Sequence, residues 1–263
     1  RSSGCGCKIG PAVLDEILQN HRNSAAIPQM LIGNEKNDDA SVWDLGDGSV
    51  LLSTTDFFMP LVDDAFDFGA VASTNALSDI YAMGGEPLFA LAILGWPIDV
   101  LPASEAARVL DGARSMCEKA GIPITGGHTI DSKEPFFGLA VTGRCATNQI
   151  RRNVGAQAGD LIYLTKPLGT GMVSTLARRG QADPEFVAEL IMQMTTLNKV
   201  GSSLGKLPSV HAMTDVTGFG LLGHLTEMLK DSKLTAQLQF NAIPRLAGVE
   251  TCLKSFFFPD MTT

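Results

Sequence analysis

Five aspartates occupy positions from which carboxylates could meet a metal ion and a phosphorylated substrate. Each one lies before or at the end of a predicted strand, or on one predicted helix: Asp38, Asp39, Asp56, Asp79 and Asp215. Mg²⁺ prefers oxygen ligands and usually takes one or two carboxylates together with substrate phosphates. Aspartate is also a common cap and turn residue, so each one alone has an ordinary structural interpretation. As a group they are candidates to hold Mg²⁺ ions along a triphosphate.

One of these aspartates shares a helix face with an asparagine. Asp79 follows Asn75 by one turn on an otherwise small and apolar predicted helix, so the two side chains lie on the same face. Polar groups on such a helix need partners. A ligand site would supply them, and so would a hydrogen bond to another helix.

The chain begins with a second candidate site, the glycine-rich stretch SSGCGCKIGP. A disulfide between Cys5 and Cys7 would be strained, because the two residues are separated by only one glycine. Zinc would need further ligands, and Cys117 and Cys145 lack the spacing of a zinc site. A thiol near Lys8 would have a lowered pKa, which makes it a candidate nucleophile or carrier of a soft atom. The alternative is a disordered chain terminus.

Known nucleotide-binding motifs are incomplete in this chain. GSSLGKL (201–207) is one residue short of a P-loop, and Leu207 stands where a serine or threonine should hold magnesium. GTGMVS (169–174) lacks the third glycine of a dinucleotide fingerprint. TGGHTID (125–131) places His128 after two glycines, which let the backbone approach a ligand closely. Its pattern alone favours a loop.

Composition bounds the class of protein. The 263 residues are 45% hydrophobic and 18% charged, with a net charge of −8, which is typical of a globular protein with a substantial core. The sequence has no basic patch of the kind that would indicate nucleic-acid binding. It also has no apolar run long enough to span a membrane. Five cysteines without a paired framework favour a reducing compartment, so we expect a cytoplasmic protein.

The elements that must position these residues alternate between strand and helix signals. In the first half we expect helices at 11–21, 67–85 and 104–121, the second capped by Asp67, together with a hairpin at 40–58 and strands at 87–96, 122–125 and 136–145. In the second half we expect strands at 160–169, 211–218 and 234–244, and helices at 185–207 and 220–232. A polar stretch at 147–159 divides them. The prediction is an α/β fold with two domains, 1–148 and 149–263.

Several motifs, in this order, resemble the selenophosphate synthetase (selenide, water dikinase) family. They include GCGCKI, NDDASVWDL, STTDFFMP, TNALSDIYAMGG, GGHTID, TKPLGTG and MTDVTGFGLLGHL. The resemblance implies conversion of ATP, selenide and water to selenophosphate, AMP and phosphate, which supplies selenium for selenocysteine and for modified tRNA. It also implies the two-domain fold of aminoimidazole ribonucleotide synthetase, with a homodimer whose N-domain strands form a barrel between subunits. Because relatives continue through more of the second domain, we expect that domain to be incomplete here.

The resemblance also implies residue roles. Cys5 and Lys8 match the active-site loop, expected to be mobile over residues 1–10, and Asp39, Asp79 and Asp215 match the Mg²⁺ ligands. The expected contacts to ATP come from Lys8, Lys36, Asn37, Asp38, Asp56, Asp79, Gly127, His128 and Thr129, of which the last three would reach the partner subunit's nucleotide.

Other functions stay open from the sequence. The nearest alternative is another ATP-using enzyme of the same superfamily. A thiol-based redox or metal-trafficking protein would use Cys5 and Cys7 without turning over ATP. A non-catalytic scaffold would use the aspartates as caps only.

Overall fold

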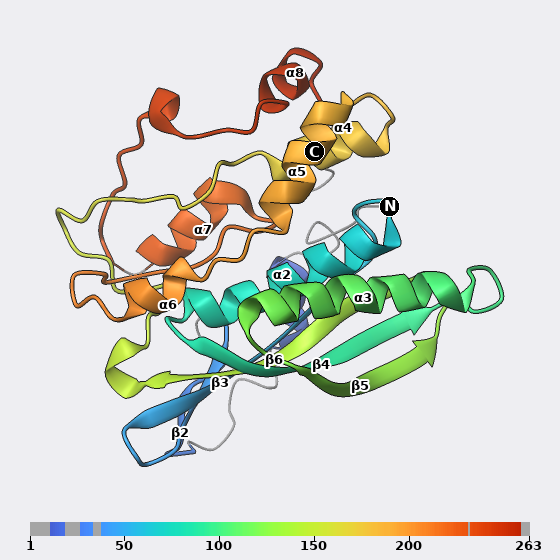
Figure 1. The fold of residues 1–263 in the computed structure, drawn as a ribbon. Helices are drawn as coiled ribbons and strands as arrows, with labels where there is room; N and C mark the ends of the chain where they lie inside the picture. Colours follow the sequence, from blue (N-terminus) through green and yellow to red (C-terminus); the bar gives the residue numbers. More distant parts are fainter. Residues whose placement is uncertain (1–10, 19–26, 34–37, 231, 259–263) are drawn as a thin grey trace.

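The computed structural model describes residues 11–18, 27–33, 38–230 and 232–258. Its central element is an open, mixed sheet of six strands in the order β1-β2-β3-β6-β4-β5 (Figure 1). The strands are β1 (Met30–Ile32), β2 (Ser41–Asp44), β3 (Ser49–Phe58), β4 (Glu86–Trp96), β5 (Ile124–Asp131) and β6 (Phe136–Ala146). All neighbouring pairs are antiparallel except β4 and β5, which run parallel. The barrel expected in a dimer requires a second copy and stays a prediction.

The predicted hairpin is confirmed, with β2 and β3 paired antiparallel from Ser41 opposite Ser53 to Asp44 opposite Val50. Its turn contains Gly46 and Gly48, both at positive φ, where a glycine avoids the steric cost of a side chain. Along β3, the side chains of Val50 and Leu52 are fully buried, and Leu51 between them is only partly buried. This alternation turns one face of the strand toward the helices.

Two helices, α2 (Ala65–Ala82) and α3 (Ala103–Ala120), lie side by side on one face of the sheet (Figure 1). Both were predicted. The cap of α2 was not, because Asp64 rather than Asp67 accepts the first hydrogen bond, from the Asp67 amide at 3.0 Å. Asp67 is already inside the first turn. Gly121 ends α3 in the left-handed conformation, as expected, with φ of 86°.

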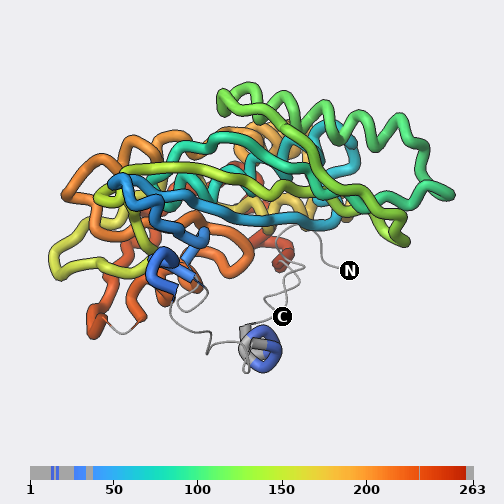
Figure 2. Tube along the Cα trace, turned by 90° about the horizontal axis from the view of Figure 1, so that it is seen from below, coloured from blue at the N-terminus to red at the C-terminus, as the bar shows by residue number. Residues whose placement is uncertain are grey.

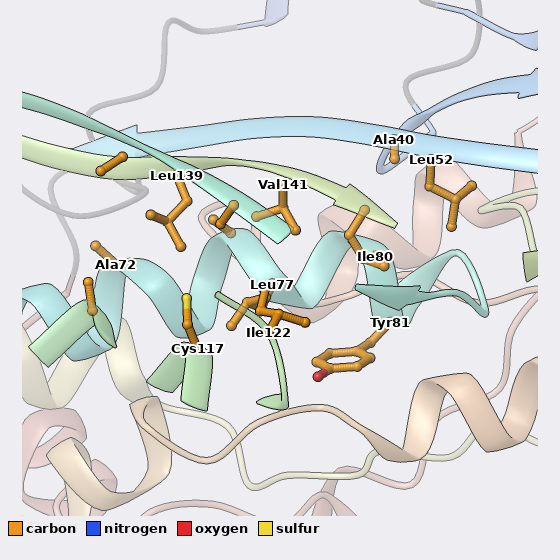
Figure 3. Close-up of a cluster of buried hydrophobic side chains, with 14 of the residues drawn as sticks. Ala40, Leu52, Ala72, Leu77, Ile80, Tyr81, Cys117, Ile122, Leu139 and Val141 are labelled. Atoms are coloured by element: carbon orange, nitrogen blue, oxygen red, sulfur yellow. The ribbon is translucent and has the colours of Figure 1, made fainter. Parts of the chain in front are cut away.

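The main core lies between α2 and the sheet. Figure 3 shows Ile80 of α2 on the side of the helix that faces Leu52 of β3 and Val141 of β6, whereas Leu77 lies on the opposite side, next to Ile122. Almost every side chain of α2 except those near its start is buried. Burial on this scale, at about 25 cal/mol per Å² of apolar surface, fixes the helix firmly against the sheet. Any polar group on α2 therefore occupies a set position.

The remaining helices are mostly in the second half. They are α4 (Thr170–Arg178), α5 (Pro184–Met194), α6 (Val200–Gly205), α7 (Gly220–Leu229) and α8 (Val249–Lys254), with α1 (Pro11–Leu18) near the start and short 3₁₀ turns at Thr147–Gln149 and Phe240–Ala242. Helices within 185–207 and 220–232 are thus confirmed, and so is the described part of the helix expected at 11–21. In Figure 2 the orange-to-red second half gathers toward one end of the sheet, whereas α3 (green) extends toward the other.

The three strands expected in the second half are wrong for the described residues. Segments 160–169, 211–218 and 234–244 form no ladder, and only Leu168 and Arg245 make an isolated bridge. An apolar, β-branched run becomes a strand only when a neighbour pairs with its backbone. Without such a neighbour, Leu161 and Tyr163 are 75% and 80% exposed.

The second half docks on the C-terminal part of α2 and the residues that follow it. Asn198 donates a hydrogen bond to the hydroxyl of Ser78 at 2.8 Å, and the hydroxyl of Ser202 donates one to the Gly85 carbonyl. Gly201 is so close to the Tyr81 carbonyl that a Cβ there would lie 2.3 Å from its oxygen. Among the described residues, no helix is long and apolar enough to cross a membrane.

Candidate metal and nucleotide site

Three carboxylates from distant parts of the chain meet at one point. Asp39 precedes β2, Asp79 lies on α2, and Asp215 follows the second-half segment 211–214. One carboxylate oxygen from each lies within 4.8 Å of the others. The structure therefore brings together the three residues that the family resemblance implies as Mg²⁺ ligands.

Strand β3 orients the polar face of α2. The hydroxyl of Thr54 donates a hydrogen bond to Asp79 Oδ2 at 2.6 Å, and the amide of Asn75 donates one to Asp56 Oδ2 at 2.5 Å. Asn75 and Asp79 thus share a face, as predicted, and β3 supplies the partners that were alternatively expected from another helix. Asp56 is 7% exposed, so it acts from inside the helix–sheet interface.

Asp39 is held on one oxygen only. Thr214 donates a hydrogen bond to Asp39 Oδ1 at 3.1 Å. The other oxygen, Oδ2, is buried and has no hydrogen-bond partner among the described residues. A buried carboxylate oxygen without a partner is costly. A cation bound between the aspartates would remove that cost.

The electrostatics of the cluster favour a cation. Burial, followed by the negative charge of Asp215, holds the pKa of Asp39 well above its usual value, and the Thr214 hydrogen bond opposes this shift. Burial and then the charges of Asp215 and Asp39 likewise raise the pKa of Asp79. Three hard oxygen ligands that repel one another fit Mg²⁺, which would neutralise them.

Lys166 is a cation near this cluster that sequence reasoning missed. Its ammonium donates hydrogen bonds to the carbonyl of Gln193, at 3.5 Å, and to that of Thr196, just beyond α5. Burial lowers the pKa of Lys166 to about 8, and the charge of Asp215 acts in the opposite direction. The only signal in the sequence is a lysine that interrupts the apolar run LIYLTKPLG.

Asp38, a suggested ATP contact, is engaged by the protein itself. Its Oδ2 accepts hydrogen bonds from Arg152 Nη2 at 2.7 Å and Nε at 3.2 Å, and its Oδ1 accepts one from the Asn153 amide at 3.1 Å. The Asp38 side chain is fully buried. Its contacts therefore tie residue 38 to the segment between the two halves of the chain.

Gly127, His128 and Thr129 lie on β5, so the loop expected from their pattern is wrong. Gly127 pairs with Ala92 of β4, and the missing side chain allows that contact, because a Cβ would lie 2.1 Å from the Ala92 oxygen. β5 is an edge strand with an exposed face. It is three strand positions from β3, about 14 Å at the usual 4.8 Å spacing, so these residues lie apart from the β3 side of the site.

The remaining suggested site residues, Cys5, Lys8, Lys36 and Asn37, lie outside the described residues.

The fold places the chain in the class of AIR synthase related proteins. The family model for the N-terminal domain of these proteins matches residues 37–145, and that for the C-terminal domain matches residues 157–256. Thiamine monophosphate kinase from Aquifex aeolicus aligns with a TM-score of 0.73 at 19% identity, over 93% of this chain and 80% of that one. A HypE–HypF complex contains a chain that aligns with a TM-score of 0.74 at 18% identity, over 94% and 79%. At these identities the likeness is one of fold.

Within that class the chain belongs to the selenide, water dikinase family. It is 56% identical to the selenide, water dikinase of Sulfurovum sp. (strain NBC37-1) over 94% of this chain and 72% of the relative. It is 52% identical to that of Aeromonas salmonicida (strain A449) over 99% of this chain and 75% of the relative. The chain thus spans about three quarters of the length of these relatives.

Proposed function

We propose that the protein makes selenophosphate from ATP, selenide and water, with release of AMP and phosphate. The observation that carries this is the identity of 52–56% to selenide, water dikinases over nearly the whole chain. The meeting of three aspartates supports it, since an acidic protein binds a triphosphate through cations. No observation favours the redox, scaffold or related-enzyme alternatives.

Asp39, Asp79 and Asp215 would hold Mg²⁺. When bound, Mg²⁺ neutralises phosphate charge, the main requirement of phosphoryl transfer. Thr54 and Thr214 keep two of the carboxylates oriented for that role. Selenide attacks the γ-phosphorus, the bond from that phosphorus to the bridging oxygen breaks, and ADP leaves. Water then attacks the β-phosphorus of ADP and releases AMP and phosphate.

We assign the N-terminal residues by resemblance. Lys8 would stabilise charge on the transferring group, and Cys5 would carry selenium, as a soft atom suits a thiol. Lys36, Asn37 and Asp56 would line the ATP site, and Asp38, whose side chain is buried against Arg152, would hold this segment in place. In a cytoplasmic homodimer, the exposed edge strand β5 would bring Gly127–Thr129 to the nucleotide of the second subunit. The separation of β5 from β3 supports this arrangement, because these residues lie apart from the β3 side of the site in their own subunit.

Phosphorus NMR of the full-length protein with ATP, Mg²⁺ and reductant tests the reaction. We expect selenophosphate, AMP and phosphate in equal amounts, and only when selenide is present. ATP that persists with selenide, or that yields ADP regardless of it, would overturn the proposal.

Three loop variants separate the proposed roles. Lys8→Ala should lose ATP cleavage, because its charge acts whatever the acceptor is. Cys5→Ser should keep ATP affinity and lose selenophosphate, and Cys7→Ser serves as the matched control with a mild effect. Equal inactivity of both cysteine variants would favour a shared metal or redox role instead.

A further inference from the structure

The segment 151–153 lies between the two halves of the chain and contacts two segments of the cluster. One carries Asp39 and the other carries Asp215. On one side, the Arg152 guanidinium and the Asn153 amide hold both oxygens of Asp38, the residue next to Asp39. Asp38 is fully buried and Arg152 is 37% exposed, so this ion pair is shielded from water on the aspartate side. Charge-assisted hydrogen bonds of this kind are shorter and stronger than those between neutral groups.

On the other side, the same arginine reaches the segment that carries Asp215. The Arg152 carbonyl accepts a hydrogen bond from the Met213 amide at 2.9 Å. Met213 is followed by Thr214, which donates to Asp39. The contacts therefore close a ring that runs from Asp39 through Asp38 and Arg152 to residues 213–214 and back to Asp39.

The ring addresses a physical problem of the cluster. Asp39, Asp79 and Asp215 repel one another, as the raised pKa values of the first two show. Asp79 is fixed by its buried helix, but Asp39 and Asp215 lie on segments without helix or strand hydrogen bonds. An external constraint must hold these two segments at ligand spacing before a cation arrives.

We propose that Arg152 is a positioning residue that holds the 38–39 and 213–215 segments together for metal binding. This inference rests on the proposed function, because it assumes that the three aspartates bind Mg²⁺. Arg152 acts through Asp38 and through its own carbonyl, and it touches neither metal nor substrate. Arginine suits the role because its planar fork contacts Asp38 Oδ2 through two nitrogens, which lysine cannot reproduce.

The test is direct binding of Mn²⁺, as a paramagnetic substitute for Mg²⁺, followed by EPR in the absence of ATP. Removing an outer partner of a metal ligand typically weakens binding 10- to 100-fold. Because Arg152 bonds the neighbour of a ligand and not the ligand itself, we expect the lower end of this range, about 10-fold, for Arg152→Gln and a smaller loss for Arg152→Lys. Arg144→Gln is the matched control, because Arg144 pairs with Asp47 at 3.0 Å on the surface, with both side chains about half exposed. It should bind Mn²⁺ like the wild type.

Coupling provides a second measurement. If Arg152 acts through Asp38, then Asp38→Asn and Arg152→Gln together should weaken Mn²⁺ binding no more than the stronger single change. Melting curves of the metal-free proteins establish that each variant is folded. Should Arg152→Gln fail to fold, the milder Arg152→Lys decides the question by the same comparison with Arg144→Gln.

Equal Mn²⁺ affinity in folded Arg152→Gln and Arg144→Gln would overturn the inference, as would additive losses with Asp38→Asn. Wild-type protein without Mn²⁺ affinity would overturn it too. Wild-type protein that binds Mn²⁺ but makes no selenophosphate would count against the proposed function alone, and the affinities of the Arg152 variants would still decide the role of Arg152.

Discussion

Thr214 donates a hydrogen bond to Asp39 across 175 residues of sequence, at 3.1 Å. The bond joins the segment before β2 to the second half of the chain at the point where three carboxylates meet. It satisfies one oxygen of Asp39 and leaves the other buried without a hydrogen-bond partner among the described residues. The contact between the two halves of the chain therefore completes the ligand set.

Replacing Thr214 with valine should weaken metal binding in a pH-dependent way. The Thr214 hydroxyl stabilises the ionised form of Asp39, so its loss should raise the already elevated pKa of that carboxyl. Protons then compete better with the metal, and the pH at which Mn²⁺ binding is half complete should move upward. Thr226→Val is the control, because the Thr226 hydroxyl only bonds the Leu222 carbonyl within α7. An unchanged pH profile in Thr214→Val would refute the role of this bond.

Asp79→Asn should stabilise the metal-free protein at neutral pH. The pKa of Asp79 is raised above 3.8 by burial and by the neighbouring carboxylates. Below pH 3.8 Asp79 is protonated in both the folded and the unfolded chain, so it does not affect the free energy of unfolding. As pH rises from 3.8 to the raised pKa of the folded state, Asp79 increasingly destabilises the folded protein, and above that pKa the loss is complete. Asparagine removes that cost while preserving an acceptor for Thr54. Urea unfolding in EDTA should show a gain over the wild type that shrinks as pH falls.

Added Mg²⁺ should reverse the order of stability. The wild type gains stability by binding the cation, and Asp79→Asn gains little. Asp111→Asn is the control, because Asp111 is 61% exposed on α3 and should respond to Mg²⁺ like the wild type. If Asp79→Asn is less stable than the wild type in EDTA at pH 7, the raised pKa is not the dominant effect.

Lys166 should titrate near pH 8 in the folded protein. Burial lowers its pKa to about 8, and Asp215 limits the shift. Asp215→Asn should therefore lower the pKa of Lys166 further, and so should Mg²⁺, which neutralises Asp215. NMR of ¹³C-methylated lysines against pH measures all three states. Between about pH 8 and 10.5 the folded chain has lost the Lys166 proton and the unfolded chain still holds it. The contribution of Lys166 to the free energy of unfolding therefore increases over this range, as the cost of burying its charge disappears. A Lys166 resonance that titrates near 10.5 would contradict the burial of its ammonium, and a pKa unchanged in Asp215→Asn would contradict its place beside the cluster.

Local patterns sufficed for the elements that position half of the site. The apolar run of α2 and the spacing of Asn75 and Asp79 predicted both the helix and its polar face, since helix periodicity is a local property. The turn glycines predicted the β2–β3 hairpin for the same reason. The hydrogen bonds between β3 and the side chains of Asn75 and Asp79 were not predictable, because the contact of a helix face with a particular strand depends on the tertiary fold.

Contacts between distant segments could not be read from the sequence. Arg152 and Asp38 are 114 residues apart, and neither residue type nor spacing indicates their ion pair. The failed strands at 160–169 and 234–244 have the same cause, since a strand requires a neighbour that local sequence does not name. The pattern of β5 was misread because glycines typical of loops here permit close strand pairing.

The adjacent glycines of β5 provide a sharp test of that last point. A Cβ at Gly127 would lie 2.1 Å from the carbonyl oxygen of Ala92, whereas a Cβ at Gly126 would meet only Leu91 Cδ2, at 3.7 Å. The Ala92 carbonyl belongs to the backbone of β4, which is paired on both sides by β5 and β6 and cannot move alone. Gly127→Ala should therefore cost about 1–3 kcal/mol of unfolding free energy, the usual range for overpacking.

Gly126→Ala, one residue away on the same strand, should stay within about 0.5 kcal/mol of the wild type, as for an exposed substitution. Urea unfolding of the two variants measures the difference, and amide hydrogen exchange locates it. Faster exchange should be confined to β4 and β5 in Gly127→Ala, because the clash separates those two strands first. Equal stability of the two alanine variants would mean that β5 does not approach β4 this closely, and the interpretation of GGHT as a loop would return.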